Sequence, residues 1–314
     1  RSIRFTGEIV MYDTLIIGSG PGGMTAALYA ARSNLKVGLI EQGAPGGQMN
    51  NTAEIENYPG YDHISGPELS MKMYEPLEKF EVEHIYGIVQ RVENDGDVKR
   101  VITEDESYEA KTVILATGAK NSLLGVPGEE EYTSRGVSYC AVCDGAFFRD
   151  QDLLVVGGGD SAVEEAVFLT QFAKSVTIIH RRDQLRAQKV LQDRAFANEK
   201  IKFVWDSVVK EIKGNEIKVS GVTVENLKTG EISEMTFGGV FIYVGLKPHS
   251  SMVSELGITD ETGWVLTDTN MKTSIPGLYA IGDVRQKDLR QIATAVGEGA
   301  IAGQGVYNYI TEHF

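Results

Sequence analysis

The sequence predicts an α/β protein built from two Rossmann-like dinucleotide-binding domains, with the second domain inserted into the first. Two observations carry this prediction. An apolar segment runs into a glycine-rich turn at Gly18, and a second apolar segment runs into a similar turn at Gly157. The same number of residues separates Gly18 from Glu41 as separates Gly157 from His180, so the two units align without a gap.

Length and composition limit the class of protein. A chain of 314 residues has room for about two domains, each with its own core. The net charge of −14 argues against nucleic acid or an anionic membrane as the main partner. No apolar run reaches the roughly 20 residues that a bilayer-spanning helix needs. We expect a cytoplasmic protein, and we interpret residues 1–10, which lack the features of a secretory signal, as an upstream extension or a cloning remnant.

The first half of the chain begins with a βαβ unit. We expect a strand at 12–17, a helix at 24–33 and a strand at 36–40. The elements predicted to follow are a long loop at 43–66, a helix at 67–80, strands at 85–92, 98–103 and 106–110, and a buried parallel strand at 112–118.

The second half repeats the βαβ pattern. Its predicted elements are a βαβ unit at 153–179, a helix at 186–198, an antiparallel meander at 208–237, a buried strand at 240–244 and a final helix at 291–310. Crossings between domains are expected at 119–128 and 245–248. The predicted first domain comprises residues 11–120 and 249–314, and the predicted inserted domain comprises residues 121–248.

The first glycine-rich turn favours a dinucleotide with an unmodified ribose. Gly18 makes the tight turn, Gly20 lets the backbone approach a pyrophosphate, and Gly23 allows close packing of helix and strand. The pyrophosphate would lie at the helix N-terminus, where free N–H groups favour anions. Glu41 can accept hydrogen bonds from ribose hydroxyls and would repel a 2′-phosphate. The alternative, a simple tight turn, does not explain the terminal acid.

The second unit carries basic residues where the first carries its acid. His180 stands at the position of Glu41, and Arg181, Arg182 and Arg186 follow it. Guanidinium groups bind phosphate in a bidentate manner, so the cluster predicts a site for the 2′-phosphate of NADPH. The alternative is a solvated basic patch. Ala162, at the third glycine position, is an accepted variant of the fingerprint.

Cys140 and Cys143, the chain's two cysteines, lie just before the second unit. Their spacing allows a small disulfide ring that opens and closes by thiol exchange. A zinc site, which would need about four ligands, and a pair of inert buried thiols are the alternatives. Asp144 is either a turn residue or a general acid for a leaving thiolate.

Taken together, these motifs resemble those of the low-molecular-weight thioredoxin reductases. The resemblance covers essentially everything after Met11. Its segments are Gly18–Gly23, Gly46–Gln48, Glu56–Gly60, Ala116–Gly118, Cys140–Gly145, Gly157–Ala162, His180–Arg182 with Arg186, Gly282–Asp283 and Arg290–Gln291.

The resemblance implies two three-layer ββα domains, FAD in the first unit, NADPH in the second, thioredoxin as the protein substrate, and a homodimer. It assigns to FAD the residues Gly18, Ser19, Gly20, Pro21, Gly22, Gly23, Glu41, Gly47, Gln48, Asn57, Thr117, Gly118, Asp283, Arg290, Gln291 and Ile292. It assigns to NADPH the residues Gly157, Gly159, Asp160, Ser161, Ala162, His180, Arg181, Arg182 and Arg186. No metal is expected.

The resemblance also implies a mechanism. Cys143 would face the flavin, Cys140 would attack the partner disulfide, and Asp144 would supply the proton. The cysteines and the NADPH fingerprint both fall in the inserted domain, so nicotinamide and disulfide would take turns at the flavin, which requires this domain to rotate about the two crossings. The alternatives are a related disulfide reductase or thiol oxidase with another redox partner, and a non-catalytic nucleotide-binding redox sensor.

Overall fold

The computed structural model describes residues 11–52 and 55–314, so the interpretation of residues 1–10 lies outside the described residues. The chain divides into two compact units. The first comprises residues up to Lys120 together with Lys247–Phe314, and the second comprises Asn121–Leu246. No helix in the described ranges is both long and apolar enough to cross a bilayer.

The first unit is built on a seven-stranded sheet. Its parallel part has the order β3-β2-β1-β6, and β17 pairs with β6 in the same direction. The antiparallel strands β5 and β4 continue the sheet from β6. The strands are β1 (Met11–Ile17), β2 (Val37–Glu41), β3 (Glu83–Tyr86), β4 (Val89–Asp95), β5 (Val98–Thr103), β6 (Ser107–Leu115) and β17 (Leu278–Ala280).

Two strand predictions in this unit were wrong. The strands expected at 106–110 and 112–118 are the single strand β6, whose first half pairs with β5 and whose second half pairs with β17. The strand expected at 85–92 is divided at Gly87, because β3 joins the edge of β2 while β4 turns away to pair with β5. A change of pairing partner leaves no mark on the apolar pattern of either segment.

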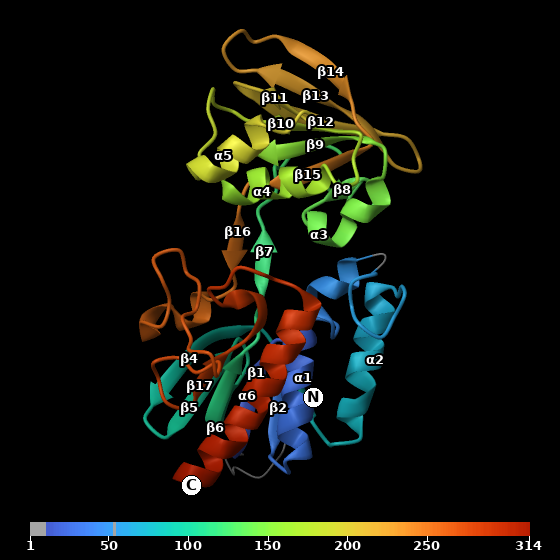
Figure 1. Cartoon of the computed structure of the whole chain (residues 1–314). Helices are drawn as coiled ribbons and strands as arrows, with labels where there is room; N and C mark the ends of the chain where they lie inside the picture. The colour runs from blue at the N-terminus through green and yellow to red at the C-terminus, as the bar shows by residue number, and fades with distance from the viewer. Residues whose placement is uncertain (1–10, 53–54) are drawn as a thin grey trace. The chain divides into compact units, whose positions relative to one another are not determined.

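Successive side chains of the central strand β1 point to opposite faces of the sheet, which explains why this unit has two cores. Ile16 packs on one face, among residues of α1 (Pro21–Arg32), α2 (Gly66–Glu78) and α6 (Ile292–His313). Leu15 and Ile17 point to the other face and pack with Val253 of the short helix η3 (Ser251–Leu256). Figure 1 shows α1 and α6 side by side against the sheet. The remaining elements of the unit are η1 (Gly47–Asn51) and η4 (Gly282–Val284).

The second unit contains a parallel five-stranded sheet of order β11-β10-β9-β15-β8. Helices cover one face, and the antiparallel meander β12-β13-β14 covers the other, which makes three layers (Figure 1). Its strands are β8 (Val137–Ser138), β9 (Asp152–Gly157), β10 (Ser175–Ile179), β11 (Ile201–Val204), β12 (Ser207–Gly214), β13 (Val219–Asn226), β14 (Ile232–Thr236) and β15 (Gly239–Tyr243). Its helices are α3 (Ala141–Asp144), η2 (Gly145–Phe148), α4 (Asp160–Leu169) and α5 (Lys189–Phe196).

The helix predicted at 186–198 is shorter than expected, because it begins at Lys189. The N–H groups of Arg186 and Ala187 both donate to the carbonyl of Gly158, at 2.7 and 3.2 Å. These bonds fix the two residues against the glycine-rich turn in a non-helical conformation. The segment after His180 is therefore a loop held to the fingerprint.

The two passages of the chain between the units pair with each other. They form the strands β7 (Ala119–Asn121) and β16 (Leu246–Pro248), which make a two-stranded sheet. On one side of this ribbon the N–H of His249 donates to Gly118, and on the other side the N–H of Ser122 donates to Gly245.

Candidate functional site

The first glycine-rich turn has the shape that its sequence predicts. Gly18 has a φ of +102°, and a Cβ there would lie 2.4 Å from the carbonyl oxygen of Ala116. A Cβ on Gly23 would lie 1.9 Å from the oxygen of Gly18, so both positions are closed to a side chain. Gly20, in contrast, has open space where its Cβ would be. The turn therefore opens at Gly20, immediately before the first residues of α1, where an anion is favoured.

Glu41, at the end of β2, is built into this turn. Its Oε2 accepts hydrogen bonds from the N–H and the hydroxyl of Ser19, both at 2.9 Å. Its Oε1 accepts from the N–H groups of Gln42 and Gly43, at 2.8 and 3.1 Å. A carboxylate accepts about four hydrogen bonds, so a ribose hydroxyl would share or replace one of these donors. The arrangement fits a ribose and leaves no place for a further negative charge.

The segment after β2 returns to the same turn. The N–H of Gly46 donates to the carbonyl of Ser19 at 2.8 Å. A Cβ on Gly47 would lie 3.4 Å from the Cα of Gly20. Gln48 is exposed next to it, within η1. The long loop predicted at 43–66 therefore contributes an ordered helical turn beside the fingerprint.

Residues far apart in sequence meet at the start of α6. The side-chain amide of Asn57 donates to Oε1 of Gln291 at 3.1 Å. Arg290 donates to the carbonyls of Asp283 and Arg285, at 3.3 and 3.1 Å, and its guanidinium lies 3.9 Å from the ring centre of Trp264. Burial lowers the pKa of Arg290, and Asp283 opposes that shift.

Asp283 is the observation in this unit that best tests for a bound flavin nucleotide. Its Oδ1 is buried and has no hydrogen-bond partner. The ammonium of Lys287 stands 3.8 Å away. Burial raises the pKa of Asp283, while Lys287 and Arg290 lower it. An unmatched buried acceptor is costly unless a ligand donor satisfies it, and a ribityl hydroxyl of FAD would do so.

The other residues assigned to FAD lie in the same unit. Thr117 and Gly118 follow β6, and the hydroxyl of Thr117 donates to the carbonyl of His249. Pro21 and Gly22 occupy the first turn of α1, and Ile292 is the first residue of α6. The described residues thus fit FAD at the open end of the parallel strands, where α/β sheets bind ligands.

The second glycine-rich turn has the same form. Gly157 has a φ of +154°, and a Cβ there would lie 2.6 Å from the carbonyl oxygen of Tyr243. Gly159 has open space around its Cβ position, and α4 begins at Asp160. The carboxylate of Asp160 accepts from the backbone and side-chain N–H groups of Gln188, at 2.7 and 3.0 Å. Ser161 is exposed, and Ala162 is buried below the turn.

The basic cluster divides into a buried ring and exposed guanidinium groups. His180 is buried, and its ring would collide with any side chain on Gly158, since a Cβ there would lie 2.4 Å from Nδ1. Burial, followed by the charges of Arg186, Arg181 and Arg182, lowers the pKa of His180. The ring is therefore neutral near pH 7. The exposed arginines carry the positive charge, and they fit a phosphate of NADPH.

The cysteine pair forms the disulfide Cys140–Cys143 at the start of α3. Cys140 is the N-cap of this short helix, and its Sγ accepts from the N–H of Cys143 at 3.2 Å. Both cysteines are half-buried. Because the disulfide engages both sulfurs, this state provides no free thiolate for a metal.

Asp144 lies one residue beyond the disulfide and is shielded from water. Burial raises the pKa of its carboxyl, and a hydrogen bond from Ser138 lowers it. The hydroxyl of Ser138 lies 2.6 Å from Oδ2 of Asp144. An aspartic acid with a raised pKa can hold a proton closer to neutral pH than an exposed one, as a general acid requires.

Several residues of the site were not predicted from the sequence. They are Ser138 and Tyr243 beside the redox pair, Glu165 on α4, and Trp264 under Arg290. The contacts of Tyr243 and Trp264 join segments that only the fold brings together, whereas Ser138 lies just two and six residues from Cys140 and Asp144. None of these residues belongs to a motif. Two signals in the sequence point toward these residues. Ser138 stands two residues before Cys140, and the glycine-rich turns direct attention to the ends of the parallel strands, where Tyr243 lies.

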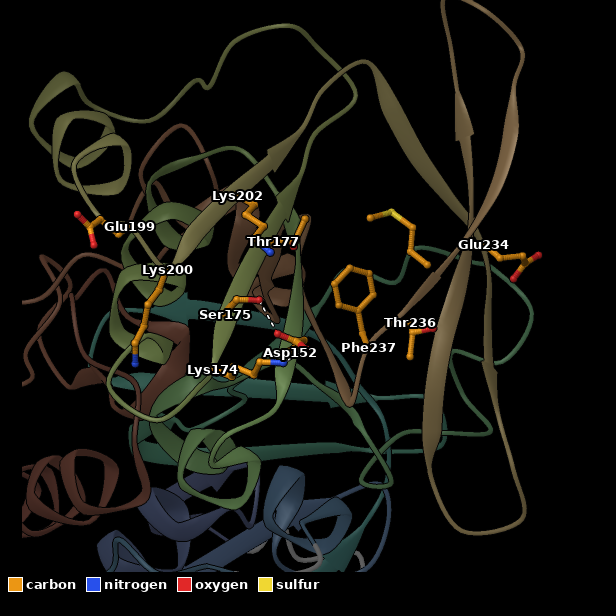
Figure 2. A pocket seen from close by; sticks show the side chains of 11 residues that line it. Asp152, Lys174, Ser175, Thr177, Glu199, Lys200, Lys202, Glu234, Thr236 and Phe237 are labelled. Atoms are coloured by element: carbon orange, nitrogen blue, oxygen red, sulfur yellow. Dashed lines mark hydrogen bonds and ion pairs between the residues drawn. The ribbon is translucent and has the colours of Figure 1, made fainter.

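A surface pocket in the second unit lies near the amino ends of β9 and β10, away from the glycine-rich turn (Figure 2). Asp152 and Ser175, which line it, are the first residues of β9 and β10, whereas the glycine-rich turn follows the last residue of β9. Lys174, Lys200 and Lys202 also face the pocket. Ligands of parallel α/β sheets bind at the carboxyl ends of the strands, so we do not assign this pocket to a nucleotide.

Comparison with known proteins agrees with this geometry. The family model for the pyridine nucleotide-disulphide oxidoreductases matches residues 12–299. The thioredoxin reductase of Listeria monocytogenes is 54% identical over 305 residues, which are 97% of this chain and 96% of that protein. The crystal structure of thioredoxin reductase from Streptococcus pyogenes is 77% identical, covers 97% of this chain and 100% of its own, and has a TM-score of 0.95. The thioredoxin reductase of Giardia duodenalis is 34% identical, covers 96% and 99%, and has a TM-score of 0.92.

Proposed function

Because this chain belongs to the pyridine nucleotide-disulphide oxidoreductase family, and within it to the thioredoxin reductases, we propose that it uses NADPH as the reductant and FAD as the bound cofactor. The observation that carries the proposal is the disulfide Cys140–Cys143, placed beside a shielded acid in the unit that also holds the arginine-bearing fingerprint. Because the homologues are thioredoxin reductases, they support thioredoxin as the disulfide substrate.

The residues of the first unit would hold FAD. The open turn at Gly20 and the N-terminus of α1 would bind its pyrophosphate, Glu41 its adenosine ribose, and Asp283 its ribityl chain. Asn57 and Gln291 would border the isoalloxazine ring. When bound, the two nucleotides supply hydride and electron transfer, which side chains cannot perform.

The cysteines and Asp144 would perform the thiol chemistry. In the dithiol state, the Cys140 thiolate attacks the disulfide of thioredoxin, a mixed disulfide forms, and one thioredoxin sulfur leaves. Asp144 gives that leaving sulfur its proton. The Cys143 sulfur then displaces the second thioredoxin sulfur, which takes up the remaining proton, and the Cys140–Cys143 disulfide is restored. Two electrons and two protons pass to thioredoxin in this exchange.

The choice between NADPH and NADH can be tested at the exposed arginines. We expect Arg181→Ala and Arg182→Ala to raise KM for NADPH by about ten- to hundredfold each, because each removes a charge-assisted phosphate contact of roughly 1.5–3 kcal/mol. Steady-state kinetics with NADH should change little. The control is Arg194→Ala on α5, outside the fingerprint loop. Equal losses with both nucleotides would contradict recognition of the 2′-phosphate.

We also propose that the protein is a cytoplasmic homodimer. A Cys-x-x-Cys pair that cycles between disulfide and dithiol is suited to a reducing compartment. The resemblance to low-molecular-weight thioredoxin reductases supports the dimer. Sedimentation analysis of the flavin-loaded protein would test it, and a single monomeric species at micromolar concentration would contradict it.

A further inference from the structure

The hydroxyl of Ser138 lies between the redox cysteine and the acid. Ser138 is the last residue of β8 and is buried. Its Oγ is 3.1 Å from the N–H of Cys140, 2.6 Å from Oδ2 of Asp144 and 3.4 Å from the carbonyl of Cys140. The N–H of Cys140 can only donate, so Oγ accepts there. The serine proton is then directed to Asp144, which is the nearer of the two acceptors.

This bond fixes both the place and the state of the acid. A hydrogen bond to Oδ2 restrains rotation of the carboxyl and leaves Oδ1 to carry the acidic proton. It also stabilises the carboxylate after that proton has left, and so partly offsets the effect of burial. Through one hydroxyl, the backbone of Cys140 and the side chain of Asp144 are held in a fixed relation.

A second hydroxyl holds the next residue of the same turn. The N–H of Ala141 donates to the phenol oxygen of Tyr243 at 2.7 Å. Tyr243 ends β15, which pairs with β8 through Val240–Val137 and Phe241–Ser138. Two neighbouring strands of the sheet therefore each send one hydroxyl to the start of α3. The redox turn is anchored to the rigid sheet at Cys140 and at Ala141.

We propose that Ser138 is a positioning residue for the thiol–disulfide exchange, holding Asp144 in line with the Cys140–Cys143 pair. The proposal deepens the function proposed above, because it requires Asp144 to be the acid of that exchange. Tyr243 holds the same turn through its hydrogen bond with the N–H of Ala141, and it makes no hydrogen bond with the Asp144 carboxyl.

The ionisable groups around Asp144 are few and can be separated by mutation. Tyr243 of β15 and Glu165 of α4 are the nearby ionisable groups. The charges of Glu165 and Asp144 both raise the pKa of the Tyr243 phenol. Of the other acids of α4, Glu164 is exposed and Asp160 is bonded to Gln188. Arg149, beyond the end of η2, is exposed and lies over Phe172. The thiols of Cys140 and Cys143 also titrate in the reduced enzyme, and Ser138 contacts the N–H of Cys140. The variant Asp144→Asn, which removes the carboxyl, therefore identifies the limb that belongs to Asp144.

The test measures oxidation of the two-electron-reduced holoenzyme by oxidised thioredoxin in stopped flow, as a function of pH. For Ser138→Ala we expect a roughly tenfold slower exchange, because the acid is no longer held in place. We also expect the alkaline limb to move up by about half to one pH unit, since a carboxyl that has lost a donor keeps its proton to higher pH. Reduction of the flavin by NADPH should be unchanged, and Ser138→Thr should restore the limb.

The matched control is Ser207→Ala, which removes another buried serine hydroxyl from the same unit, one that bonds only to Trp205. It should leave both rate and limb at wild-type values. Tyr243→Phe provides a second variant if Ser138→Ala does not fold, and it should slow the exchange without moving the limb. A Ser138→Ala enzyme with wild-type rate and limb would overturn the proposal.

The variant Asp144→Asn separates this proposal from the function on which it rests. If Asp144→Asn removes the alkaline limb and Ser138→Ala has no effect, the role of Ser138 fails and the acid stands. If Asp144→Asn retains the wild-type rate and limb, then Asp144 is not the acid, and the assignment of Ser138 falls with it.

Discussion

Three carboxyl groups show how local surroundings give one functional group different roles. Glu41 accepts four hydrogen bonds, which fix its carboxylate beside the glycine-rich turn. Asp144 receives only one hydrogen bond from a side chain, that of Ser138, and burial raises the pKa of its carboxyl. It can therefore hold a proton for transfer. Glu165 has a buried oxygen, Oε2, without a hydrogen-bond partner. Burial, reinforced by the charge of Glu164, raises the pKa of Glu165 to about 7.

The raised pKa of Glu165 makes stability depend on pH. The folded state favours the protonated acid, so its contribution to stability is complete below the unfolded pKa of about 4.5 and is lost as pH rises through about 7. We expect Glu165→Gln to unfold at a higher temperature than wild type at pH 8, and to lose that advantage by pH 5. Thermal scans across this range measure the difference.

The neighbouring residue provides the control for that experiment. Glu164 lies on the same helix and is exposed, so Glu164→Gln should change the melting temperature only slightly, through removal of its repulsion of Glu165. If both variants behave alike, or if the gain of Glu165→Gln does not vary with pH, burial of the Glu165 carboxyl is not the cause.

At the residue scale, the sequence predicts positions whose constraint is local. Gly18 and Gly157 are required by the backbone of a tight turn, and that requirement is visible in the chain itself. Tyr243 is different, because its hydroxyl meets the N–H of Ala141 only once β8 and β15 are neighbours in the sheet. Ser138 lies two and six residues from Cys140 and Asp144, but it belongs to no motif that would single out its hydroxyl. The neutral state of His180 is also hidden, since burial against Gly158 follows from the fold.

At the element scale, the packing of α1 on α6 determines the position of the first turn. A Cβ on Gly299 would lie 2.4 Å from the oxygen of Gly22 and 2.9 Å from Cβ of Thr25. Helices approach this closely only where one of them lacks side chains. The N-terminus of α1, which would face the pyrophosphate, therefore packs against the backbone of α6 at Gly299.

We predict that Gly299→Ala destabilises the protein by about 1–3 kcal/mol, because the added methyl overpacks this contact. Displacement of α1 should also weaken retention of the flavin. Gly297→Ala is the matched control on the same helix, where nothing lies within 4 Å of the Cβ position. That change should be neutral or stabilising, by up to about 1 kcal/mol, through helix propensity. Chemical unfolding and the ratio of flavin to protein absorbance measure both effects, and equal behaviour of the two variants would contradict the packing argument.

Element boundaries show where pattern-based prediction ends. The apolar periods predict the meander of the second unit and its parallel strands, which β12 to β15 confirm. The start of α5 was missed because two N–H groups donate to the carbonyl of Gly158 instead of continuing a helix. The division of the strand predicted at 85–92 was missed because strand pairing is decided by partners distant in sequence.

At the scale of the whole molecule, the chain passes twice between its units. Both passages lie in the ribbon formed by β7 and β16. Since the arginine-bearing fingerprint and the disulfide belong to one unit and the residues assigned to FAD belong to the other, we propose that the second unit rotates about this ribbon during turnover. Gly245 is the position where such a rotation is most easily restricted, because its φ is +144° and a Cβ there would lie 3.0 Å from Oγ of Ser122.

We expect Gly245→Ala to lower steady-state turnover by about tenfold, equivalent to about 1.4 kcal/mol in the barrier, because alanine narrows the available dihedral range. A single reduction of the flavin by NADPH should still reach full amplitude. Gly230→Ala is the control, since Gly230 also has a positive φ, of +73°, but lies in a hairpin with open space around it. Wild-type turnover of a folded Gly245→Ala enzyme would argue against rotation at this position. Covalent linkage of the two units should stop turnover and permit one half-reaction.

The central claim is that electrons reach thioredoxin through the disulfide of Cys140 and Cys143, and one anaerobic titration tests it most directly. The yellow holoenzyme is reduced with NADPH, oxidised thioredoxin is added, and flavin absorbance is followed. We predict that wild type is bleached and then recovers its colour. The Cys140→Ser and Cys143→Ser variants should be bleached by NADPH and stay bleached when thioredoxin is added. Recovery of either serine variant at the wild-type rate would contradict the account.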